Sequence, residues 1–202
     1  RYERNDYGII IPYPPERDTF SLRIKYSGRP VSAGMAALSF AEHNKDITVY
    51  TLNEPIYAST WFPCSDMPSD KALLDISITN DSSRVSVSNG VPAGITSRGR
   101  KRTYRWKSLN PVATYLISIY SAKYSIIRDY YINGEGDTLD IFYYAFPGRE
   151  EEVRADFKKH PDMIRVFSEM FGEYPFMNEK YAVAMFMWNF GGMENQTITG
   201  IG

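Results

Sequence analysis

The sequence predicts a mainly β protein: an antiparallel, sandwich-like domain followed by a short α+β region. Short apolar segments recur between turn residues through the first 145 residues, as in stacked sheets. Aromatic residues make up 15% of the 202 residues, and aromatic side chains favour half-buried pleated surfaces. After Pro147 the apolar spacing becomes helical, which marks the start of the α+β region.

The β region divides into short strands separated by turn residues. The segment 20–26 alternates apolar and polar residues with a period of two. Asn80-Asp81 and Asn89-Gly90 supply turn chemistry at the ends of two strands. Residues 29–46 have a weaker pattern and are predicted to form a loop. The predicted strands are 8–12, 20–26, 47–52, 74–79, 84–88, 103–106, 115–120, 124–132 and 138–145.

The α+β region begins with a helix near residue 150. Glu150, Glu151 and Glu152 favour a helix start because acidic side chains complement the positive N-terminal end of the helix dipole. Val153 and Phe157 are four residues apart and therefore share one face.

A second helix and a strand are predicted to follow. Pro161 fits the first turn of the helix, and Gly172 fits its end. Residues 181–186 are continuously apolar and predict a buried strand. The helix is expected to bury a stripe made of Ile164, Phe167, Met170 and Phe171.

Composition argues against several classes of partner. The formal net charge is −1, from 23 basic and 24 acidic residues, so neither nucleic acid nor an anionic membrane is an expected partner. No apolar run approaches the roughly 20 residues that span a bilayer, so no membrane span is predicted. Cys64 is the one cysteine, which excludes a disulfide within the chain.

Common catalytic motifs are absent from the sequence. The two histidines, His43 and His160, are not in HExxH spacing, and neither is expected to be a catalytic metal ligand. The sequence has no GxSxG segment and no glycine-rich phosphate loop.

The remaining candidate is the segment Gly191-Gly192-Met193-Glu194-Asn195. Two glycines after a buried strand allow the backbone to approach another backbone or a ligand closely. A carboxylate two residues later can face such a ligand. The residues alone also fit a β-bulge or a hairpin with a solvated glutamate, which is a common use of paired glycines.

Three segments together resemble the HExxH zinc aminopeptidases, which are gluzincins of the aminopeptidase N and leukotriene-A hydrolase type. Gly191–Asn195 is similar to the family's GxMEN motif. Residues 61–68, followed by Lys71-Ala72, are similar to its FPCxDxPxxKA segment, and residues 171–176 to its FGxYPF segment. The three matches occur in the family's order and cover about residues 8 to 199.

The resemblance implies substrate-binding roles. Glu194 would bind the free α-ammonium of a peptide, a charge-assisted hydrogen bond that rejects blocked N-termini. Glu54, ten positions before Cys64, would share the ammonium; its other reading is a polar loop residue. The backbone of Gly191 and Gly192 would run beside an extended substrate. Two further residues, Met193 and Asn195, would line the pocket or hold the loop.

The resemblance also implies a division of the chain and of its chemistry. We expect residues 1–136 to form the β-rich N-terminal domain, with its opening strands missing. Residues 137–202 would begin a thermolysin-like catalytic domain and end before the zinc motif. Zinc is expected in the complete protein and not on this chain, which should cleave no peptide alone. The unpaired sheet edges of such a fragment favour self-association.

Two alternatives to a peptide-cleaving parent remain open. One is a bifunctional epoxide hydrolase and aminopeptidase of the leukotriene-hydrolase type. The other is a non-catalytic homologue that serves as a scaffold. The partners expected for an aminopeptidase are peptides with a free N-terminus.

Overall fold

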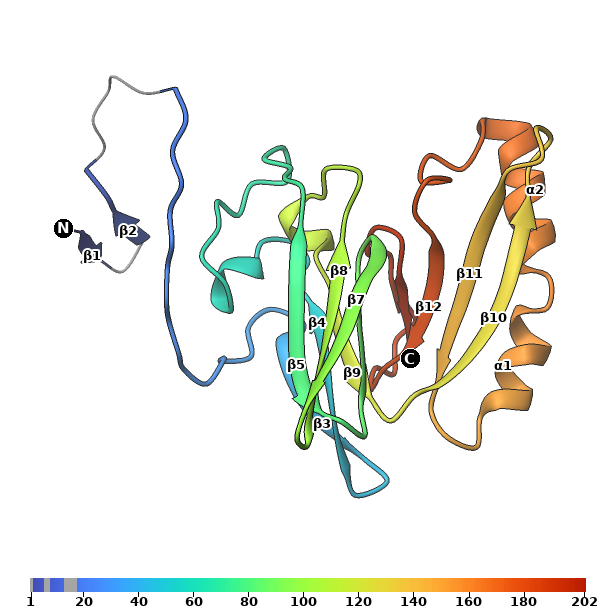
Figure 1. Ribbon diagram of the computed structural model, residues 1–202, viewed down its shortest axis with the longest axis horizontal. Helices are drawn as coiled ribbons and strands as arrows, with labels where there is room; N and C mark the ends of the chain where they lie inside the picture. The colour runs from blue at the N-terminus through green and yellow to red at the C-terminus, as the bar shows by residue number, and fades with distance from the viewer. Residues whose placement is uncertain (1, 6–7, 13–17) are drawn as a thin grey trace.

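A computed structural model describes residues 2–5, 8–12 and 18–202 (Figure 1). Its first element is a two-stranded antiparallel ribbon that lies apart from the body of the molecule. The ribbon consists of β1 (Glu3–Asn5) and β2 (Gly8–Ile10). A long extended segment then leads into the body.

Two antiparallel sheets form the β-rich part of the body. The four-stranded sheet has the order β3-β4-β9-β6, and the three-stranded sheet has the order β5-β8-β7. The strands are β3 (Ala37–His43), β4 (Asp46–Leu52), β5 (Asp75–Asp81), β6 (Val85–Ser88), β7 (Val91–Arg98), β8 (Lys101–Lys107) and β9 (Ile119–Ala122). Short 3-10 helices lie at Ala58–Thr60 and Thr114–Leu116.

A five-stranded mixed sheet follows, with the order β10-β11-β12-β14-β13. Two helices connect β11 to β12 and cover one face of this sheet (Figure 1). Because β11 and β12 are parallel, the chain needs such a crossover between them. The elements are β10 (Ser125–Ile132), β11 (Thr138–Ala145), α1 (Glu150–Phe157), α2 (His160–Phe171), β12 (Tyr181–Met185), β13 (Gly192–Met193) and β14 (Thr199–Ile201).

Burial follows the residue pattern of each strand. In β8, Tyr104 and Trp106 are buried and the residues between and after them are exposed, as period two requires. In β12 the three central residues are all buried, which is typical of a strand covered on both faces. The expected mainly β, antiparallel fold class is confirmed.

Two apolar cores lie on the two faces of the five-stranded sheet. The larger core joins this sheet to the two β-rich sheets and includes Leu52, Trp106, Tyr120, Tyr144 and Met193. The second core lies between the five-stranded sheet and the helices. It includes Ile127, Leu139, Ile141, Val153 and Val183. The large core therefore connects the β-rich part to the sheet that carries the glycine motif.

Several predicted boundaries in the β-rich part are wrong. Residues 20–26 are extended but belong to no strand, because alternation creates two faces and does not by itself specify a neighbouring strand. The predicted loop at 29–46 contains β3, which pairs with β4 along seven residue pairs. The predicted strand at 115–120 is a 3-10 turn followed by β9. β7 was missed because nearly all its residues are exposed, so it lacks an apolar alternation.

The helices are confirmed, but the expected buried stripe of α2 is wrong. Val153 of α1 is buried, and Gly172 ends α2 with φ of 98°. In α2, Ile164 packs against the second core. Phe167, Met170 and Phe171 are 58%, 68% and 75% exposed. No part of the described chain covers these three side chains.

Candidate functional site

The motif glycines form the outer edge of the five-stranded sheet. Gly191 has φ of 96°, a left-handed conformation that favours glycine, and its carbonyl accepts a hydrogen bond from the Gly202 N–H at 3.0 Å. At Gly192 an added Cβ would lie 2.8 Å from the Gly200 carbonyl oxygen. One glycine is therefore required by its backbone conformation and the other by close strand approach.

The three residues after the glycines differ in burial. Met193 is 1% exposed in the large core, and Asn195 is 3% exposed. The Asn195 Nδ2 donates to the Tyr120 hydroxyl at 2.7 Å. Glu194, between them, is exposed. The two buried side chains fix the loop and leave the carboxylate at the surface.

The charge of the Glu194 carboxylate contributes to the pKa of Tyr120 in β9. Burial is the main cause that raises the pKa of the Tyr120 hydroxyl. The hydrogen bond from Asn195 lowers it, and the Glu194 carboxylate raises it. Tyr120 pairs with Tyr50 of β4, four residues before Glu54, and its hydroxyl accepts a hydrogen bond from Asn195, the residue after Glu194.

Glu54 is half-exposed at the end of β4, directly after a fully buried asparagine. The Asn53 Nδ2 donates to the Ile117 carbonyl at 2.7 Å, and the Asn53 Oδ1 accepts from the Trp61 Nε1 at 2.8 Å. Asn53 therefore holds the backbone of Glu54 against the segment that leads into β9.

The same segment also holds the loop that follows Glu194. Asn89 Nδ2 donates to the Leu116 carbonyl at 2.8 Å and to the Gln196 carbonyl at 2.7 Å. The structure thus brings the backbones that carry Glu54 and Glu194 onto one common support, residues 116–120. Sequence reasoning missed Asn53, Asn89 and Tyr120, which carry no motif signal of their own.

The residues around Cys64 have structural roles. Burial, with the nearby Asp66 and Asp70, raises the pKa of the Cys64 thiol to about 11, which leaves it protonated and unreactive at neutral pH. The thiol is half-buried. Asp66 accepts a hydrogen bond from the Ser59 N–H at 2.8 Å, and the Asp70 N–H donates to the Met67 carbonyl at 2.9 Å. These hydrogen bonds stabilise the backbone around the segment.

The donor set of the chain does not fit a zinc site. His43 stacks on Phe146 with ring centroids 4.0 Å apart. The ring centroids of His160 and Phe157 are 4.6 Å apart, and burial lowers the pKa of His160. Within the described ranges, no three His, Cys, Asp or Glu side chains gather as metal ligands would. Nor is either described α-helix long and apolar enough to cross a membrane.

Residues 2–116 match the model of the peptidase M1 N-terminal domain. The chain therefore belongs to the M1 peptidase family, as the three motif segments indicated.

Curated relatives of the chain are aminopeptidases. It is 24% identical to a probable aminopeptidase 2 of Sulfurisphaera tokodaii over 174 residues, which are 86% of this chain and 22% of that protein. It is 22% identical to a leucyl aminopeptidase of Saccharolobus solfataricus, again over 86% of this chain and 22% of the relative. The chain thus spans about a fifth of the length of these relatives.

Solved structures share the fold. A two-domain M1 zinc metallopeptidase variant bound to L-tryptophan matches with a TM-score of 0.74 and 23% identity, over 87% of this chain and 40% of that one. The aminopeptidase A of Legionella pneumophila, solved with aspartic acid, matches with a TM-score of 0.71 and 19% identity. That match covers 82% of this chain and 20% of the other.

Proposed function

We propose that this chain is the amine-recognising N-terminal portion of a zinc aminopeptidase that releases N-terminal residues from peptides. Glu194 and Glu54 bind the α-ammonium of the substrate in this proposal. The aminopeptidase names of the curated relatives support the activity class. The observation that carries the proposal is the position of the motif: an exposed glycine backbone at a sheet edge, followed two residues later by an exposed carboxylate.

The edge position suits an extended peptide. β13 pairs with β14 on one side only, so its other side can hydrogen-bond to a substrate strand. Gly191 and Gly192 have no side chains to obstruct that approach. An ammonium at the end of the bound strand would then meet Glu194 in a charge-assisted hydrogen bond. The buried side chains of Met193 and Asn195 hold the loop that carries Glu194.

Cleavage is not assigned to residues of this chain, since the His, Cys, Asp and Glu side chains that the structure describes form no group of metal ligands. Zinc belongs to the proposed complete enzyme, and this portion supplies recognition. The division into residues 1–136 and 137–202 also stays a proposal. The family match ends at residue 116, and β10, before residue 136, pairs with β11, after it.

Binding of a small amine tests the recognition role. L-Leucinamide, titrated into the chain, should shift the NMR amide signals of Gly191 and Gly192. N-acetyl-L-leucinamide, which lacks the ammonium, should not. Glu194→Gln should weaken leucinamide binding about tenfold or more, equivalent to roughly 1.4 kcal/mol or more, because it removes the charge from the hydrogen bond. Glu54→Gln should weaken it less.

Glu151→Gln is the matched control, because Glu151 is an exposed carboxylate on α1. It should leave leucinamide binding unchanged. Equal shifts with both ligands, or equal binding by Glu194→Gln and the control, would contradict amine recognition by Glu194.

A further inference from the structure

A buried lysine, Lys180, contacts the loop that follows Glu194. Lys180, the residue before β12, is 1% exposed. Its Nζ donates to the Ser88 carbonyl at 3.1 Å, the Thr197 carbonyl at 3.3 Å and the Thr197 hydroxyl at 3.4 Å. The Nζ also lies 5.2 Å from the centroid of the Trp106 ring. Lys180 therefore reaches from β12 to two other segments.

The hydrogen-bond partners of this lysine are neutral. The neighbouring Glu179 instead accepts hydrogen bonds at Oε1 from the Leu109 and Asn110 N–H groups, at 2.7 and 2.8 Å. A buried amine without hydrogen bonds is strongly unfavourable, so its partners determine whether the residue is tolerated. An apolar side chain would fill the same space without that requirement, which points to a role for the amine itself.

Thr197, the main partner of Lys180, has a strained backbone. The Ile198 N–H donates to the Asn195 carbonyl at 3.1 Å and closes a four-residue turn with Thr197 in third position. Thr197 has φ of 64°. That conformation suits glycine or asparagine, and a β-branched residue rarely adopts it. The turn must therefore be held by contacts from outside it.

Those contacts come from Lys180 and from the β6–β7 turn. The Thr197 hydroxyl accepts a hydrogen bond from the Gly90 N–H at 2.9 Å as well as from Lys180. Lys180 at the same time binds Ser88 at the end of β6. One amine thus ties the turn that begins at Asn195 to the four-stranded sheet.

We propose that Lys180 is a positioning residue that holds the 195–198 turn closed and thereby fixes the adjacent Glu194 relative to the N-terminal sheets. The role of the fixed carboxylate rests on the proposed function, since Glu194 is taken to bind the amine. The burial that lowers the pKa of Lys180 to about 7 is consistent with an amine enclosed by these contacts.

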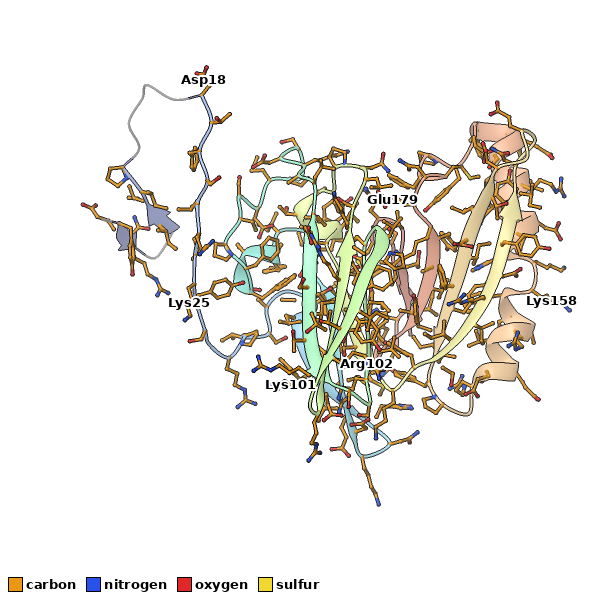
Figure 2. The ribbon with its side chains drawn as sticks, viewed as in Figure 1. Asp18, Lys25, Lys101, Arg102, Lys158 and Glu179 are labelled. Carbon is orange, nitrogen blue, oxygen red and sulfur yellow. The ribbon has the colours of Figure 1, made fainter. Side chains whose placement is uncertain are left out.

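Amide hydrogen exchange of the whole chain tests the proposal without any ligand. The Ile198 amide reports closure of the turn. Lys180→Met should reduce its protection at least tenfold. Thr197→Gly, added to Lys180→Met, should restore the protection, because glycine adopts a positive φ without strain. Thr197→Gly alone should keep it. Lys158→Met is the control, since Lys158 is exposed and points away from the molecule (Figure 2).

Each outcome decides the proposal. Rescue of Ile198 protection by glycine, including the rescue of a Lys180→Met protein that fails to fold alone, supports it. Unchanged protection in Lys180→Met overturns it. Loss of protection throughout the sheet that glycine does not restore also overturns it and assigns Lys180 to packing.

Leucinamide titration of the same variants separates this proposal from the function it rests on. Lys180→Met should weaken binding and the double variant should recover it. If the wild-type chain binds no leucinamide, amine recognition fails, and the exchange experiment still tests the turn.

Discussion

At the scale of single residues, two neighbours of opposite charge connect β12 to the N-terminal sheets. Glu179 binds the backbone at Leu109 and Asn110, and Figure 2 shows it where the β-rich part meets β12. Lys180 binds Ser88 and Thr197. Both side chains are less than 10% exposed, at 8% and 1%. Because each satisfies buried groups on another segment, loss of either leaves unpaired polar atoms in the interior.

Burial of Lys180 makes stability depend on pH. Burial lowers the pKa of Lys180 from 10.5 to about 7, and Glu179 opposes the change. Between these values the unfolded chain binds the extra proton, so the free energy of unfolding increases as pH rises. From pH 7 to 9 the increase should approach roughly 1.4 kcal/mol per pH unit. Urea unfolding at several pH values measures it.

Lys180→Met removes this titration, so its unfolding free energy should vary much less from pH 7 to 9. Lys158→Met should keep the wild-type slope. The range stops at pH 9 because buried tyrosines such as Tyr144, whose pKa is raised by burial, lower stability as the unfolded chain begins to lose its phenolic protons. A slope shared by the Lys180→Met and wild-type proteins would exclude a depressed pKa at Lys180.

At the scale of elements, the β13–β14 hairpin combines a required glycine with an exposed edge. Gly192 pairs with Ile201, and Met193 pairs with Gly200. The buried side chain of Met193 anchors the hairpin in the core. The hydrogen bond from the Gly202 N–H to the Gly191 carbonyl joins the two ends of the hairpin. The stability of this short hairpin therefore depends more on the close approach of its two strands than on its length.

Gly192→Ala should destabilise the chain by about 1–3 kcal/mol, because its Cβ would press on the Gly200 carbonyl oxygen and separate β13 from β14. Urea unfolding measures the loss, and the Gly202 amide should exchange faster as the hairpin opens. Gly134→Ala, where a Cβ meets no atom within 4 Å, should change stability by less than about 0.5 kcal/mol. Equal effects at both positions would refute the close-approach argument.

At the scale of the whole molecule, apolar and hydrogen-bonding surfaces remain open. β10 and β13 are the edges of the five-stranded sheet. On α2, Met163, Val166, Phe167 and Met170 are all more than 40% exposed and lie on one face. Exposed edges and contiguous apolar faces both favour association.

We expect the chain to self-associate, with α2 contributing to the contact. Sedimentation velocity should show a mass that increases with protein concentration. Phe167→Glu should shift the distribution toward monomer, because it places a charge in the middle of the exposed apolar face. Lys158→Glu, at the exposed residue directly after α1, should not. A concentration-independent monomer for the wild-type chain would rule out self-association.

The sequence by itself identified the family and most of the secondary structure. The glycine motif, the segment around Cys64 and the segment 171–176 are local patterns, and their order along the chain is readable without a fold. Strands whose residues alternate in burial, such as β5 and β8, are readable for the same reason. The left-handed conformation of Gly191 is a local requirement, whereas the need for glycine at position 192 depends on the close approach of Gly200.

Tertiary structure alone decided which segments found partners and what supports the site. The alternating residues 20–26 form no strand, whereas β3 and β7 become strands because neighbours complete their hydrogen bonds. The outer face of α2 is exposed because the helix has the sheet on one side only. Lysine side chains are seldom fully buried, so the sequence alone places Lys180 at the surface. In the fold, Lys180 is buried beside Thr197 and supports the loop that follows Glu194. Local sequence patterns do not encode such contacts, because the residues that make them are far apart in the chain.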